Sequence, residues 1–103
     1  MYPIRYIMFE VLTTDEFDHW LSDLADERIR TKIASRVARL RFGNPGDVRP
    51  VGAGVSEMRV HHGPGYRVYY KQTQKTIIVI LCGGDKSTQD GDIKRAKEMA
   101  AQL

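Results

Sequence analysis

Two alternating segments on either side of Gly63-Pro64-Gly65 constrain the fold of this chain most strongly. Val55 to His62 and Tyr66 to Gln72 both alternate apolar and polar residues, which is the period of a half-buried β-strand. The glycines and proline between them are typical of a turn. The sequence therefore predicts a β-hairpin with one face on a hydrophobic core.

The two faces of this hairpin differ sharply in chemistry. With Pro64 at the centre of the turn, the apolar face pairs Met58 with Tyr70, Val60 with Val68, and His62 with Tyr66. The other face pairs Glu57 with Lys71, Arg59 with Tyr69, and His61 with Arg67. Charged and proton-transferring side chains are therefore predicted to gather on one side of the sheet.

Two helices are predicted before the hairpin. The first follows Thr13 as its N-cap, and its apolar stripe contains Phe17, Trp20, Leu21 and Leu24. The second follows Asp26 and ends at Gly43 to Gly46, where glycine and proline stop a helix. It carries two parallel stripes, one apolar (Ile29, Ile33, Val37, Leu40) and one basic (Arg28, Lys32, Arg36, Arg39).

Strands are predicted at both ends of this arrangement. Tyr2 to Val11 is rich in β-branched and aromatic residues, and Thr76 to Cys82 is apolar on both faces, as a central strand would be. Gly83-Gly84 is expected to break the latter, and a last helix is expected from about Thr88. The order β-α-α-β-β-β-α indicates an α+β fold, with helices packed on a twisted, mainly antiparallel sheet.

Length and composition indicate one soluble domain spanning residues 1–103. Of the residues, 42% are hydrophobic and 28% are charged, which is typical of a globular chain. The longest apolar run, Ile77 to Cys82, is far shorter than the about 20 residues that span a bilayer. We recognise no signal peptide, and we expect a cytoplasmic protein with Cys82 as a buried thiol.

The charged hairpin face suits a phosphodiester substrate. Arginine binds phosphate oxygens in a bidentate way and stabilises charge that develops on them. RNA cleavage also requires one group to take a proton from the 2′-hydroxyl and another to give a proton to the leaving oxygen. His61, Glu57 and Tyr69 are candidates for this transfer, and Lys86 follows the central strand. The alternative is an ordinary solvated face with cross-strand charge pairs.

Other catalytic motifs are absent from the sequence. There is no phosphate loop of the form G-x-x-x-x-G-K-[ST] and no nucleophile elbow of the form G-x-S-x-G. His61 and His62 point to opposite faces of a strand, so they cannot bind one metal ion together there. We expect no metal and no cofactor.

Three segments resemble a known family. Gly54 to Val60, Gly63 to Tyr70 and Gly83 to Gln89 are similar to the signature of HigB-like toxins in the RelE/ParE superfamily. The front half of the chain fits as well, with Phe17 and Trp20 in the first helix and Arg36 and Arg39 in the second. The resemblance covers nearly the whole chain.

The resemblance implies a bacterial type II toxin that a cognate antitoxin, of the helix-turn-helix type, neutralises. Relatives cleave mRNA on the ribosome without a metal, and operator DNA is bound only through the antitoxin complex. Arg59, Arg67 and Lys86 match the basic positions of the family and are expected to bind the scissile phosphate. Glu57 belongs to the same motif and is expected to orient Arg59 or act as a base. Apart from the resemblance, further RNA contacts are expected from Lys71 on the hairpin and from Arg36 and Arg39 on the basic helix stripe. The alternatives for this stripe are pairing with an acidic antitoxin segment and an ordinary solvated helix face.

The sequence departs from several ribosome-dependent relatives, which place a Tyr or His near the chain end. Neither residue occurs after Lys86. Two alternatives therefore stay open. One is a ParE-like inhibitor of DNA gyrase, and the other is a non-catalytic antitoxin partner that acts in operator repression.

Overall fold

The structure, a computed structural model, describes residues 8–103. It contains β1 (Glu10–Thr13), α1 (Asp15–Asp23), α2 (Glu27–Ala38), β2 (Val48–Gly52), β3 (Val55–Val60), β4 (Tyr66–Gln74), β5 (Ile77–Asp85) and α3 (Gln89–Ala100). Short 3₁₀ helices, Arg39–Phe42 and Lys86–Thr88, follow α2 and precede α3. The predicted strand Tyr2 to Val11 lies mainly outside the described residues, and β1 covers only its end.

The five strands form one sheet in the order β1-β5-β4-β3-β2. β1 runs parallel to β5, and the other neighbouring strands are antiparallel. The predicted α+β class and mainly antiparallel sheet are confirmed. The predicted element order lacked β2, because this edge strand is largely exposed and contains Pro50, so its sequence carries little strand pattern.

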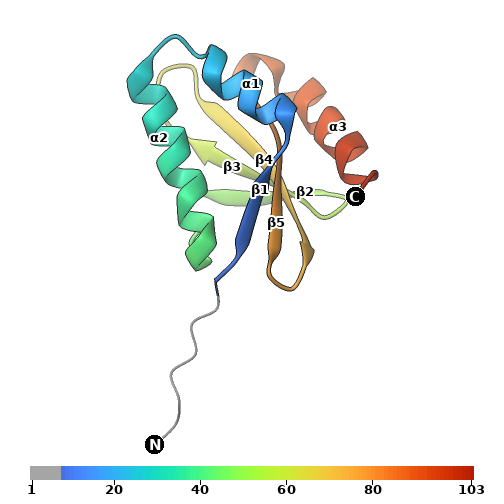
Figure 1. The fold of residues 1–103 in the computed structure, drawn as a ribbon. Helices are drawn as coiled ribbons and strands as arrows, with labels where there is room; N and C mark the ends of the chain where they lie inside the picture. The colour runs from blue at the N-terminus through green and yellow to red at the C-terminus, as the bar shows by residue number, and fades with distance from the viewer. Residues whose placement is uncertain (1–7) are drawn as a thin grey trace, which may run out of the picture.

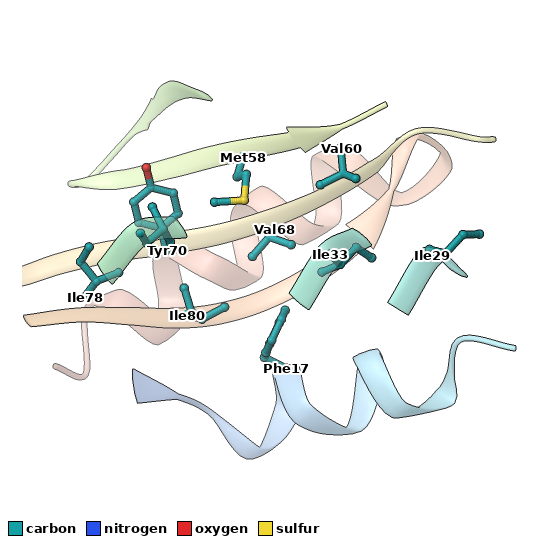
Figure 2. Packing of buried hydrophobic residues seen from close by; sticks show 10 residues of the cluster. Phe17, Ile29, Ile33, Met58, Val60, Val68, Tyr70, Ile78 and Ile80 are labelled. Atoms are coloured by element: carbon teal, nitrogen blue, oxygen red, sulfur yellow. The ribbon is translucent and has the colours of Figure 1, made fainter. Parts of the chain in front are cut away.

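Helices cover both faces of the sheet (Figure 1). α1 and α2 cover one face, where Phe17, Ile29 and Ile33 pack against apolar side chains of β3, β4 and β5 (Figure 2). α3 covers part of the other face, where Ala96 and Ala100 pack against Tyr69, Leu81 and Cys82. The charged face of the hairpin, for which the sequence analysis considered either a substrate or solvent, is thus partly buried beneath α3.

The hairpin pairs its strands in a different register from the predicted one. Arg59 lies opposite Arg67, Glu57 opposite Tyr69, and Met58 opposite Val68. The link between the strands is longer than expected, because pairing ends at Val60 and Tyr66 and residues 61–65 form the turn. Within it, the His62 carbonyl oxygen accepts a hydrogen bond from the Gly65 N–H at 3.0 Å. The shift is two residues, so each side chain keeps its predicted face while its cross-strand partner changes.

Two boundary predictions were wrong. α1 begins after Thr14, whose hydroxyl accepts a hydrogen bond from the Phe17 N–H at 3.1 Å, and not after Thr13. β5 continues through Gly83 and Gly84 instead of stopping there. A Cβ on Gly83 would lie 2.4 Å from the Trp20 ring, and one on Gly84 would overlap the Asp92 carboxylate. Both glycines therefore allow close packing of α1 and α3 on a continuous strand.

Candidate nucleic-acid interface

Arg59 and Arg67 form a directly opposed pair of cations on the face of the sheet that α3 partly covers. Like charges opposite each other on neighbouring strands repel, so such a pair needs compensation. The Nε atoms of both side chains are buried and have no hydrogen-bond partner within residues 8–103. We call these two residues the arginine pair. An anion placed against the exposed parts of the two guanidinium groups would reduce the repulsion between them.

Asp47, immediately before β2, contacts one member of the arginine pair and one histidine. Its Oδ1 accepts a hydrogen bond from Arg59 NH2 at 3.1 Å, and its Oδ2 lies 2.5 Å from His61 Nε2. The hydrogen bond with His61 is the main cause of the lowered pKa of Asp47; desolvation opposes it less strongly, and the charge of Arg59 adds a smaller lowering effect. The His61 side chain is 75% exposed, so the imidazole is accessible to a bound substrate.

Lys86 reaches the same end of the sheet. Its backbone N–H and the NH1 group of Arg67 both donate to the carbonyl oxygen of Gly65, at 3.0 and 2.9 Å. The Lys86 side chain is exposed at the start of the segment that leads into α3. The structure thus brings together four of the predicted site residues, Arg59, His61, Arg67 and Lys86.

Glu57 and Tyr69, by contrast, are fully buried. The carboxylate of Glu57 accepts hydrogen bonds from Arg49 Nε (2.9 Å), Gln89 Nε2 (3.0 Å) and the Tyr69 hydroxyl (3.1 Å). Burial disfavours the charged form of Glu57, but these donors outweigh it and lower its pKa. Burial and the neighbouring carboxylate raise the pKa of Tyr69 far above its ordinary value, so the phenol stays protonated.

The other predicted RNA contacts are dispersed. Arg36 donates to the carbonyl oxygens of Arg59 and Pro45, both at 2.9 Å, and thereby fixes the loop before β2 to α2. Arg39 is exposed at the end of α2. Lys71 lies four residues along β4 from Arg67, about 13 Å away, with its side chain over Gly54. Of these three residues, Arg36 contacts the arginine pair through the backbone of Arg59, and Arg39 and Lys71 lie apart from it.

The sequence analysis missed two charged residues beside the arginine pair, Asp47 and Arg49. Both alternate with Val48 and Pro50, so they share the face of Arg59 and Glu57. The sequence analysis assigned no strand to this segment, so it overlooked that alternation. The expected contact of Glu57 with Arg59 is replaced by two separate pairs, Asp47 with Arg59 and Glu57 with Arg49.

Residues 8–103 contain no group of three or more His, Cys, Asp or Glu side chains placed to hold a metal ion. None of the helices in this part of the chain is both long and apolar enough to cross a bilayer.

Comparison with known proteins places the chain in a family. The model of phage-derived Gp49-like proteins (DUF891) matches residues 19–103. An uncharacterized protein of Haemophilus influenzae is 50% identical over 94 residues, which cover 91% of this chain and 95% of that protein.

Two solved structures have a similar fold at low sequence identity. A mutant of the E. coli toxin RelE in the free state aligns with a TM-score of 0.68 and 11% identity, over 92% of this chain and 96% of that one. A chain of the toxin–antitoxin complex RelBE2 from Mycobacterium tuberculosis aligns with a TM-score of 0.57 and 21% identity, over 78% of this chain and 100% of that one. The predicted resemblance to the RelE/ParE superfamily is thus confirmed in the fold, and the chain belongs to the phage-derived Gp49-like family.

Proposed function

We propose that this protein is the toxin of a toxin–antitoxin system and that it cleaves mRNA on the ribosome without a metal ion. The arginine pair carries the proposal, because two arginines directly opposite each other, with one carboxylate hydrogen-bonded to them within the described residues, favour a further anionic ligand. The RelE-like fold supports it, since the similar chains are a toxin and a member of a toxin–antitoxin complex. Action on mRNA would locate the protein in the cytoplasm.

The arrangement suits cleavage by the neighbouring 2′-hydroxyl. This oxygen loses its proton and attacks phosphorus, and the bond from phosphorus to the 5′-oxygen breaks as that oxygen gains a proton. Arg59, Arg67 and Lys86 would stabilise the negative charge that builds on the phosphate oxygens. His61 is the best-placed proton-transfer group, because it is exposed and its Nε2 contacts Asp47. Glu57 and Tyr69 could reach a substrate only if α3 moved away.

A cognate antitoxin, of the helix-turn-helix type, is the proposed partner. It would neutralise the toxin by covering the arginine pair or by displacing α3. The second route is physically accessible, because α3 buries small side chains, Ala96 and Ala100, and is tied to α1 by the exposed ion pair of Arg95 and Glu16. Binding of operator DNA would occur only through the antitoxin complex.

The decisive experiment maps RNA 5′ ends across the transcriptome after brief expression without antitoxin. We expect growth arrest with new ends inside translated frames, and neither effect for the R59A/R67A variant. Growth arrest without new RNA ends would contradict the nuclease proposal and favour a gyrase inhibitor, which the DNA-damage response would then reveal. Normal growth would favour a non-catalytic antitoxin partner.

A further inference from the structure

The fully buried carboxylate of Glu57 joins four elements of the fold. Its two oxygens accept hydrogen bonds from β2 through Arg49, from β4 through Tyr69 and from the start of α3 through Gln89. We call these four residues the Glu57 cluster. A buried carboxylate is tolerated only when such donors satisfy it, so its position is tightly determined by its partners.

Within this cluster, Arg49 is the member that faces solvent. Its side chain is 47% exposed, whereas that of Glu57 is fully buried. Only Nε is used in the bond to Glu57, and its two terminal nitrogens have no hydrogen-bond partner within residues 8–103. Glu57 thus holds the Arg49 guanidinium at Nε and leaves its two terminal nitrogens available to a ligand.

The sheet register places Arg49 next to the proposed phosphate site. Arg49 lies opposite Glu57, and Arg59 lies two residues further along β3 on the same face. Diagonal neighbours of this kind are about 7–8 Å apart, within reach of long side chains. A nucleic-acid backbone on the arginine pair would therefore pass beside Arg49.

From this geometry we propose that Arg49 is a further phosphate-contacting residue, and that Glu57 is a positioning residue that orients it instead of a proton-transfer base. Gln89 completes the arrangement from α3. The inference rests on the proposed function in that it takes the same RNA as ligand. A general base must reach the proton that it removes, and both oxygens of Glu57 are occupied and shielded from solvent.

The test measures binding and cleavage separately, with the full-length chain. The binding probe is an oligonucleotide with 2′-deoxy nucleotides, which lack the hydroxyl that cleavage requires. Its binding is titrated by fluorescence anisotropy at several salt concentrations. We expect R49A to weaken binding about tenfold. It should also reduce the slope of the logarithm of the binding constant against the logarithm of the salt concentration by about one, as loss of one phosphate contact does. K75A, which removes one cation from the turn between β4 and β5, is the matched control and should bind normally.

A double-mutant cycle distinguishes positioning from base catalysis. If Glu57 acts through Arg49, E57Q weakens binding in the wild-type background and has no further effect in the R49A background. If Glu57 is a base, E57Q lowers kcat in both backgrounds and removes one limb of the pH–rate profile. The second result would overturn the proposal, as would normal binding by R49A.

Two controls keep this outcome separate from other failures. Q89A removes a single donor to Glu57 and should weaken binding two- to threefold only when Arg49 is present, so it replaces E57Q if that variant does not fold. If the wild type binds the probe but cuts no RNA, and R49A still binds less tightly, the nuclease proposal fails while the role of Arg49 stands. Absence of probe binding by the wild type would overturn the role of Arg49, whereas the mapping of RNA 5′ ends decides the nuclease proposal.

Discussion

Replacing one member of the arginine pair should change stability in a way that depends on salt. At a separation of about 6 Å, two unit charges repel by about 0.7 kcal/mol in water and by about 2.8 kcal/mol at an effective dielectric constant of 20. R67Q removes this repulsion, but it also removes the hydrogen bond from Arg67 to the Gly65 carbonyl oxygen, which contributes about 0.5–1.5 kcal/mol. We therefore expect R67Q to be more stable than the wild type by about 0.5 kcal/mol at low salt.

The sign should reverse when the charges are screened. The Debye length falls from about 30 Å at 0.01 M salt to about 3 Å at 1 M, so the repulsion fades while the lost hydrogen bond remains. R67Q should then be less stable than the wild type by about 0.5–1 kcal/mol. The measurement is urea unfolding, since urea is uncharged and leaves ionic strength under separate control.

K75Q is the control for a general effect of net charge, because it removes the same charge from a turn distant from the arginine pair. Its stability relative to the wild type should change little with salt. The reasoning is refuted if R67Q is destabilised equally at both salt concentrations, because the arginine pair would then carry no net repulsion.

Three further predictions concern the framework of the site. G83A should destabilise the fold by roughly 1–3 kcal/mol in chemical denaturation, because the new Cβ would lie 2.4 Å from the Trp20 ring; an unchanged midpoint would contradict this packing. A53G should stabilise it by about 0.5–1 kcal/mol, since Ala53 has a φ of 55° in the turn between β2 and β3; a loss of stability would argue against that turn. D47N should lose less stability than the wild type as the pH falls below about 4. The lowered pKa of Asp47 stabilises the fold at pH values above the ordinary pKa of 3.8, and this contribution is lost as the pH falls through the folded-state pKa. An unchanged pH profile would show that the contacts of Asp47 with His61 and Arg59 do not persist in solution.

The sequence pattern was sufficient for the fold class and for the side of the sheet on which each hairpin residue lies. Side-chain alternation has a period of two, so Met58 and Val68 remain on the core face after a register shift of two residues. Pairing partners depend on the turn itself, which pattern analysis does not determine. The opposition of Arg59 and Arg67 therefore required the structure.

The remaining errors come from long-range packing. The sequence has no local signal that α3 will cover the charged hairpin face, because Ala96 and Ala100 form only a narrow apolar stripe. Gly83 and Gly84 resemble a strand break by composition, whereas their lack of a side chain leaves room for Trp20 of α1 and Asp92 of α3. Both outcomes depend on how the helices pack on the sheet, which local sequence patterns do not determine.

The charged face of the hairpin is divided by α3 into two parts with different chemistry. Under α3, Glu57 is compensated by three donors, so this part is stable without a ligand. Beyond α3, Arg59 and Arg67 oppose each other with Asp47 as the one carboxylate hydrogen-bonded to them within the described chain, so this part is only partly compensated. A folded protein tolerates such local conflict mainly where function requires it. The partly compensated part is therefore where a bound phosphate would be stabilised most. Arg49, which is held by Glu57 in the compensated part, would add one more cation beside it.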